Sequence, residues 1–244
     1  MISGVFQMNQ TGKQHRLSSV TENYLLSLYI LREQNERATQ VHLADYIRNL
    51  PAEEGLGSSL PSVTAMLKRM EKDDLVVVEG KKTVRFTGRG LKAAETMIRR
   101  HRLASCMVVE MLDIPLERAY IEAHRLEHAI SNELEQHINK KLKNPSKCPF
   151  GRPIPGNQQK ISTQGIFKLS EIETGVQIQI ERIPPEDQPL LEFLISKKIL
   201  PKQFCTVTEA GKYRGVLVLK VLNEDVALGY QTADQILVEK ITTS

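Results

Sequence analysis

A single carboxylate on the apolar face of a predicted helix constrains this chain more than any other feature. Residues 97–138 contain two helical patterns, and the second carries an apolar stripe at steps of three and four. The stripe consists of Leu116, Ala119, Tyr120, Ala123, Leu126, Ile130, Leu134 and Ile138. Glu127 lies on it, with His124 and His128 in reach, and a buried carboxylate is costly unless a cation or metal receives it. The pattern therefore predicts one long helix, Leu116 to Leu142, that carries half of a metal site.

Composition places the chain among globular proteins of one to three domains. No apolar run reaches the ~18 to 20 residues of a membrane span, and no secretory pattern opens the chain, so a cytoplasmic location is expected. The cysteines, Cys106, Cys148 and Cys205, are widely spaced and indicate neither a disulfide framework nor a zinc ribbon.

The charge is unevenly divided. Residues 1–160 hold 24 Lys and Arg against 18 Asp and Glu, whereas residues 161–244 hold 9 against 11. The basic surplus is densest between Lys81 and Arg102. Such a run is either a solvated face or a surface for nucleic acid.

Residues 18–90 predict a winged helix-turn-helix DNA-binding domain. The expected elements are helices at Val20–Arg32, Gln40–Asn49 and Ser62–Lys72 and a hairpin formed by Leu75–Val78 and Thr83–Phe86. In such a module the third helix enters the major groove, and the wing contacts phosphates. The basic candidates for DNA contact are Lys68, Arg69, Lys81, Lys82 and Arg85. The alternative is a small helical domain whose hairpin has no binding role.

The remaining chain predicts three further regions and a flexible tail at residues 1–17. Residues 91–143 are expected to form a helical metal-binding and dimerisation domain, whose first helix, Leu91–Leu112, carries His101. A proline-rich connector at 144–162 leads to a small β-barrel at 163–244. Its expected elements are strands at Val176–Ile180, Gly215–Val221, Val226–Leu228 and Ile236–Val238 and a helix at Pro189–Ile195. The apolar helices offer a homodimer surface, which suits a palindromic operator.

Five motifs in this order resemble one known family. They are TENYLLSLYIL, PSVTAMLKRMEKDDLVVV, RRHRLA, EAHRLEHAIS and CPFGRPIPG. Over residues 18–156 the chain resembles the diphtheria toxin repressor and manganese transport regulator family of bacterial metal-dependent repressors, and its last part is similar to the SH3-like domain of longer members. The resemblance implies a fold that is mainly α with β: a winged helix-turn-helix, a helical dimerisation domain and a small SH3-like β-barrel. It also implies a homodimeric repressor of iron or manganese homeostasis genes, not an enzyme, that binds double-stranded operator DNA when Fe(II) or Mn(II) is bound.

The resemblance also assigns residues by position. The family's principal metal site maps onto Asn23, His124, Glu127 and His128, and the ancillary site maps onto His101, Ser105 and Tyr120. The DNA-contacting positions map onto Ser59, Pro61, Ser62, Thr64 and Ala65. Four departures from the family pattern stand out. His124 stands where the branches of the family have cysteine or glutamate. Asn23 replaces an aspartate or methionine, so that Glu22 could substitute for it; Ser105 and Tyr120 are poor ligands, which leaves His101 as a weaker ancillary candidate; and the Pro51–Ser59 insertion lengthens the turn before the recognition helix.

Several alternatives remain open from the sequence. Imidazole and carboxylate without thiolate suit any of Mn(II), Fe(II), Co(II), Ni(II) or Zn(II). Glu127 could instead pair with Arg99, Arg100 or Arg125. A metal-independent regulator of the same fold could sense redox through Cys106 or respond to another ligand, and a metallohydrolase is a further class. The C-terminal domain is either a stability or interaction module, or supplies Glu181 or Glu186 to a metal site.

Overall fold

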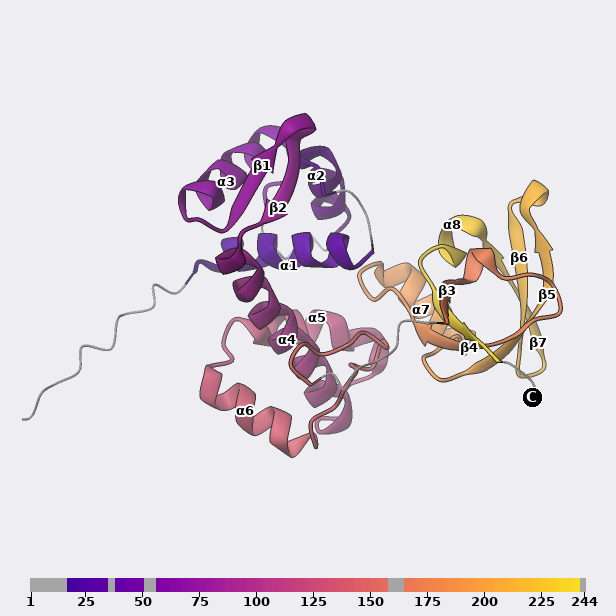
Figure 1. Ribbon diagram of the computed structural model, residues 1–244. Coiled ribbons are helices and arrows are strands. Elements are labelled where there is room, and N and C mark those ends of the chain that lie inside the picture. Colours follow the sequence, from indigo (N-terminus) through magenta and orange to yellow (C-terminus); the bar gives the residue numbers. More distant parts are fainter. Residues whose placement is uncertain (1–16, 35–37, 51–55, 158–164, 242–244) are drawn as a thin grey trace, which may run out of the picture.

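The computed structural model describes residues 17–34, 38–50, 56–157 and 165–241. These residues form three successive parts: three helices with a hairpin, three further helices, and a six-stranded sheet (Figure 1). The predicted fold class, mainly α with β, is confirmed. Residues 1–16 of the predicted tail and residues 51–55 of the predicted insertion lie outside the described residues.

The first part is the predicted winged helix-turn-helix. Its elements are helices α1 (Ser19–Glu33), α2 (Gln40–Asn49) and α3 (Leu60–Lys72), antiparallel strands β1 (Val76–Glu79) and β2 (Thr83–Phe86), and the 3-10 turn η2 (Gly80–Lys82) between them. Ser18, Thr39 and Ser59 cap the three helices, because each side chain accepts a hydrogen bond from a backbone N–H of the first turn. Helix α3 begins two residues before the predicted start, with Pro61 in its first turn, where the missing N–H costs nothing.

The second part consists of α4 (Gly88–Glu110), α5 (Leu116–Glu127) and α6 (Asn132–Lys141). The prediction of one helix from Leu116 to Leu142 is wrong. The chain leaves the helix after Glu127, and the Ser131 side chain caps α6 by accepting a hydrogen bond from the backbone N–H of Leu134 at 3.1 Å. Leu134, predicted on the buried stripe, is 47% exposed. The break places Glu127 and His128 together at the C-terminal end of α5.

The proline-rich segment after α6 is an ordered loop that packs on both of its neighbours. Phe150 and Ile154 are buried, and the backbone N–H of Ile183 donates to the Phe150 carbonyl oxygen at 3.2 Å. Gly151 has a positive φ of 81°, and a Cβ at this position would lie 1.8 Å from the carbonyl oxygen of Glu181. Only glycine therefore lets the loop approach the sheet so closely.

The third part is an antiparallel sheet in the order β3-β8-β4-β5-β6-β7. Its elements are β3 (Ile166–Lys168), η3 (Leu169–Glu171), β4 (Gln177–Arg182), α7 (Gln188–Ser196), β5 (Phe204–Gly211), η4 (Lys212–Arg214), β6 (Val216–Val221), β7 (Glu224–Gly229), α8 (Tyr230–Ala233) and β8 (Leu237–Lys240). The four predicted strands and the predicted helix are present, whereas strands β3 and β5 were not predicted. No helix among the described residues is both long and apolar enough to cross a membrane.

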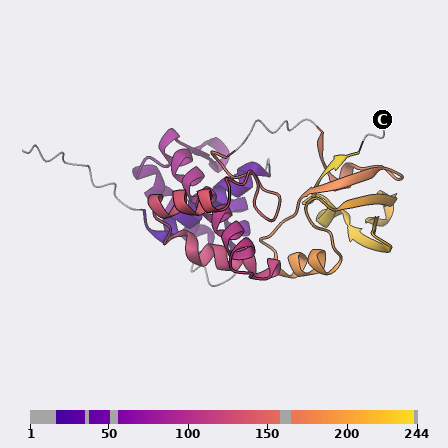
Figure 2. The ribbon, with the colours of Figure 1, turned by 90° about the horizontal axis from the view of Figure 1, so that it is seen from below.

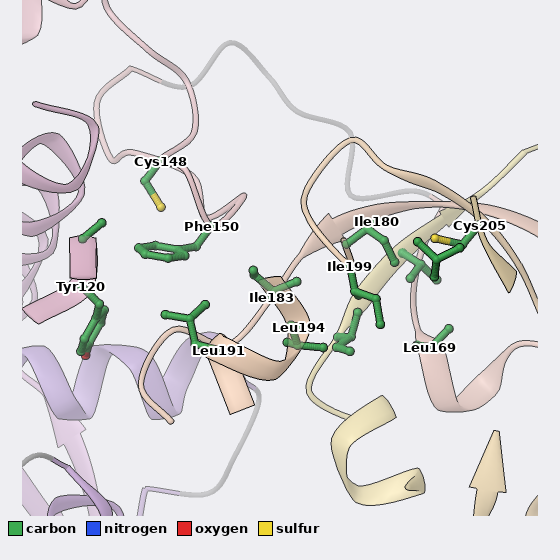
Figure 3. Close-up of a cluster of buried hydrophobic side chains, with 14 of the residues drawn as sticks. Tyr120, Cys148, Phe150, Leu169, Ile180, Ile183, Leu191, Leu194, Ile199 and Cys205 are labelled. Atoms are coloured by element: carbon green, nitrogen blue, oxygen red, sulfur yellow. The ribbon is translucent and has the colours of Figure 1, made fainter. Parts of the chain in front are cut away.

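One buried apolar cluster joins the helical part to the sheet. Figure 3 shows Phe150 between Tyr120 on one side and Ile183 and Leu191 on the other, and the Tyr120 and Phe150 rings meet edge to face at 6.5 Å. Helix α7 packs against α5, as Figure 2 shows from below. The Gln188 side chain at the start of α7 donates to a carbonyl oxygen of α5 at 2.9 Å. The sheet is therefore docked on the helices rather than merely tethered to them.

Buried arginines join the same parts electrostatically. Arg102 of α4 is 1% exposed and pairs with Glu33 at the end of α1, with one Nη1···Oε1 distance of 2.9 Å. Arg152 pairs with Glu186 at 2.6 Å and approaches Glu33 at 3.8 Å. Burial alone would raise the pKa of Glu33, but these arginines and Arg182 lower it below its ordinary value. The basic run that ends at Arg102 is thus partly an internal network.

We expect Phe150→Ala to lower the free energy of unfolding by about 3–5 kcal/mol, because it empties a buried site shared by two parts of the chain. Phe204→Ala is the matched control, since Phe204 is 58% exposed, and it should change stability by less than about 1 kcal/mol. Chemical denaturation of both variants measures the difference. Equal effects would contradict the docked arrangement.

We also expect Glu33→Gln to flatten the dependence of stability on acid pH. Because the folded pKa of Glu33 is lowered, its pairing stabilises the fold fully above the ordinary glutamate pKa of about 4.3 and is lost as pH falls toward the folded value. Unfolding at roughly pH 7, 5 and 3.5 should therefore show a smaller acid loss in Glu33→Gln than in the unmodified chain. Glu173→Gln, at an exposed loop position, is the control and should keep the full acid dependence.

Candidate metal centre and nucleic-acid interface

Three helices meet around one buried carboxylate. Glu127, the last residue of α5, has a fully buried side chain (0% exposed). Helix α4 packs against both α1 and α5, and this packing brings their side chains together. Helix α4 contributes His101, the C-terminal end of α5 contributes His124 and His128, and the first turn of α1 contributes Glu22.

The Glu127 carboxylate is shared by three imidazoles. Its Oε2 lies 2.6 Å from Nδ1 of His101, and its Oε1 lies 3.0 Å from Nδ1 of His124 and 3.5 Å from Nε2 of His128. Nδ1 of His128 in turn lies 2.7 Å from Oε2 of Glu22. Burial alone would raise the pKa of Glu127, but His101 and then His124 lower it, so Glu127 is an anion at neutral pH.

These side chains fit a divalent transition ion. His101, His124 and Glu127 each offer one ligand atom, and these atoms lie within 4.8 Å of one another. Imidazole and carboxylate ligands suit the ions from Mn(II) to Zn(II). Asn23 is buried, and its Oδ1 has no hydrogen-bond partner among the described residues. A buried amide oxygen without a partner is costly, so a cation at this oxygen would relieve a real deficit.

The geometry joins residues that the family resemblance assigns to separate sites. His101, expected in a weaker ancillary site, is hydrogen-bonded to Glu127 of the principal one. Ser105 and Tyr120, which map onto the ancillary site with His101, make other contacts. The Ser105 hydroxyl donates to the His101 carbonyl oxygen at 2.9 Å, and the centroids of the Tyr120 and His101 rings lie 4.8 Å apart. Glu22, the suggested substitute for Asn23, contacts His128 from α1.

The structure favours histidines over arginines as the partners of Glu127. Arg99 and Arg100 both pair with Glu135 of α6, at 2.6 and 3.4 Å, and Arg125 pairs within α5. The alternative in which an arginine neutralises Glu127 therefore loses its candidates to other carboxylates.

Cys106 has the surroundings of an inert core residue. It is fully buried, and burial raises the pKa of its thiol well above the ordinary cysteine value. The reactive species in redox sensing is the thiolate, which this environment suppresses. The structure therefore gives no support to redox sensing through Cys106.

The second candidate surface is the outer face of α3 and the wing. Val63, Leu67 and Met70 are buried on the inner face of α3. The predicted DNA-contacting residues Ser59, Pro61, Ser62, Ala65, Lys68 and Arg69 are exposed, and Thr64 is half-buried. On the wing, Lys82 and Arg85 are exposed, and the side chain of Lys81 lies outside the described set. Polar and basic groups thus share one surface, as a recognition helix and wing require.

Comparisons with known proteins agree with this arrangement. The model of the iron dependent repressor, metal binding and dimerisation domain matches residues 87–156, and the model of the FeoA domain, which is SH3-like, matches residues 167–240. The chain is 32% identical over 211 residues to the diphtheria toxin repressor of Corynebacterium efficiens. The matched region covers 85% of this chain and 85% of the relative. It is 29% identical over 237 residues to the iron-dependent repressor IdeR of Mycobacterium leprae, covering 92% of this chain and 99% of the relative.

A solved structure gives the same answer for the whole fold. A manganese-dependent transcriptional repressor in complex with manganese is similar to this chain with a TM-score of 0.79 and 26% identity. The similarity covers 91% of this chain and 100% of the other. All three parts of the fold therefore recur together in a known repressor.

If His101 belongs to the same site as Glu127, His101→Ala should weaken Mn(II) binding by about 10- to 100-fold. His137→Ala, which removes an exposed histidine from α6, is the matched control and should leave binding unchanged. Calorimetric titration of chelator-treated protein measures both affinities. Unchanged affinity in His101→Ala would exclude His101 from the site.

Proposed function

This chain belongs to the diphtheria toxin repressor family of metal-dependent repressors, and we propose that it represses iron or manganese homeostasis genes as a metal-gated homodimer. The observation that carries the proposal is the buried Glu127 carboxylate, shared by histidines of two helices and linked through His128 to α1. The relatives are named iron-dependent or manganese-dependent repressors, and Fe(II) or Mn(II) is the cofactor we propose here. We expect the protein to act in the cytoplasm, as a regulator rather than as an enzyme.

We assign the metal site to His124, Glu127, His128 and His101, with Asn23 or Glu22 as the ligand from α1. Glu127 is the anion that makes a cation favourable in this buried place. The histidines can bind only as neutral imidazoles, so acid pH should oppose binding. A bound divalent cation would supply the positive charge that lets these carboxylates and imidazoles be buried together.

The gating follows from which elements carry the ligands. Glu22 and Asn23 lie in α1 of the DNA-binding part, whereas Glu127 and His128 lie at the end of α5. Holding these residues together fixes the winged helix-turn-helix against the helical part, and in a homodimer this sets the spacing of the two α3 helices. Operator affinity can rise only by the metal's differential affinity for that state, typically a factor of 5 to 150.

Contact with double-stranded DNA is assigned to the exposed face of α3 and to the wing. Lys68, Arg69, Lys81, Lys82 and Arg85 supply charge for phosphates, and the first turn of α3 supplies Ser59, Pro61, Ser62, Thr64 and Ala65 for the groove. Phosphate contacts release counterions, so binding should weaken steeply as salt rises.

We expect Glu127→Ala to keep the fold and the weak, salt-sensitive binding of the metal-free protein but to lose metal-induced tightening. The variant removes the anion at the centre of the site and leaves the DNA face unchanged. Operator affinity is measured by fluorescence anisotropy at fixed salt, with chelator, with Mn(II) and with anaerobic Fe(II).

The matched control is Glu122→Ala, which removes a carboxylate that pairs with Arg118 and Arg125 on the surface of the same helix. It should retain the full metal response. If metal tightens operator binding equally in Glu127→Ala and in the unmodified protein, the assigned site is not the regulatory one. A metal-independent operator affinity in the unmodified protein would refute metal gating itself.

A further inference from the structure

A tyrosine next to the candidate ligands of α1 reaches the start of the recognition helix. Tyr24 is 1% exposed, and its ring lies in the winged-helix core with Leu67 and Val63 of α3. Its hydroxyl donates a hydrogen bond at 3.0 Å to the carbonyl oxygen of Gly57, in the loop that precedes α3. A carbonyl oxygen can only accept, so the tyrosine hydroxyl is the donor in this contact.

The receiving loop is in close contact with the first turn of α3. A Cβ on Gly57 would lie 2.8 Å from Cβ of Ser62, closer than neighbouring atoms tolerate. Two residues beyond Gly57, the Ser59 hydroxyl caps α3 by accepting from the backbone N–H of Ser62, and the two serine hydroxyls lie 2.7 Å apart. A displacement of the Gly57 backbone therefore reaches the cap of the recognition helix directly.

The donor of this hydrogen bond, Tyr24, is held rigidly. Glu22 and Tyr24 lie in the first two turns of α1, a helix of 15 residues, so a shift that moves the Glu22 backbone moves the Tyr24 backbone with it. Tyrosine has only two side-chain torsions, and the core holds its ring. Apolar contacts in the core have no preferred direction, whereas the strength of a hydrogen bond depends on its distance and angle. The hydrogen bond from Tyr24 to Gly57 can therefore make the position of the loop depend on the position of α1.

We propose that Tyr24 is a positioning residue that couples the metal site to the N-terminal turn of α3 through its hydrogen bond to Gly57. The inference rests on the proposed function, because it says by which contact metal binding at α1 reaches the DNA-reading surface. It assigns Tyr24 no contact with metal or DNA.

The test is Tyr24→Phe, which keeps the ring in the core and removes only the hydroxyl. The Gly57 carbonyl oxygen lies on an exposed residue and can turn to water, so the melting temperature should stay close to that of the unmodified protein. The ratio of operator affinities with Mn(II) and with chelator should fall about 3- to 10-fold, the range expected for one neutral hydrogen bond. Mn(II) affinity without DNA should change less than about 2-fold.

Tyr29→Phe is the matched control, because it removes the same hydroxyl from the same helix outside this contact. It should leave the affinity ratio unchanged. By reciprocity, the loss of coupling in Tyr24→Phe must also appear as a smaller gain in Mn(II) affinity when operator is added. A loss of stability alone would not produce this matched pair of changes.

A second variant tests the other partner. Gly57→Ala should push the loop away from Ser62 and reduce the same ratio, and adding Tyr24→Phe to it should cause little further loss if the two residues act through one contact. Additive losses, or a normal ratio in Tyr24→Phe when the unmodified protein responds to metal, would overturn the inference. Absence of any metal response in the unmodified protein would instead refute the proposed function on which it rests.

Discussion

The candidate metal site, where α1, α4 and α5 meet, depends on one carboxylate that has no access to water. A buried anion requires positive or hydrogen-bonding partners, and Glu127 obtains them from its own helix and from His101 of α4. His128 extends the chain of contacts to Glu22 of α1. Helix α5 ends at Glu127, and His128 follows as its C-cap with helical backbone angles (φ −70°, ψ −22°), so both side chains reach the site from the last turn of α5.

Local patterns were sufficient to predict most of the fold. Helices α1, α2 and α3, the wing and the strands β4, β6, β7 and β8 follow from periodicity, capping residues and β-branched runs. The break between α5 and α6 did not follow, because the apolar spacing continues through it and only the serine at position 131 marks the new start. Leu134 shows the limit of periodicity: it has the right spacing for the stripe but belongs to another helix with another orientation.

The candidate site was only half predictable for a related reason. Glu127, His124 and His128 are neighbours in sequence, so helical spacing alone groups them. His101 is 26 residues from Glu127, and only the packing of α4 on α5 brings the two side chains within 2.6 Å. Arg102 belongs to the basic run in the sequence, but its side chain is buried. It donates hydrogen bonds to the Glu33 carboxylate and to the Pro153 carbonyl oxygen, and both acceptors are too far away in the sequence for a local pattern to reveal them.

Helix α1 is held at both ends by buried charged groups, and this gives the C-terminal part a physical connection to the candidate metal site. Near its start, Glu22 contacts His128; at its end, Glu33 contacts Arg102 and Arg152, and Arg152 also binds Glu186 of the C-terminal part. Glu186 therefore pairs with Arg152, and Glu181 pairs with Lys147. The C-terminal part can contact α1 in this way without supplying either carboxylate as a metal ligand. Glu22 and Glu33 lie on the same helix of 15 residues, so these contacts form a continuous path from the C-terminal part to Glu22. If metal binds at the candidate site as proposed, any coupling through this shared helix would act in both directions.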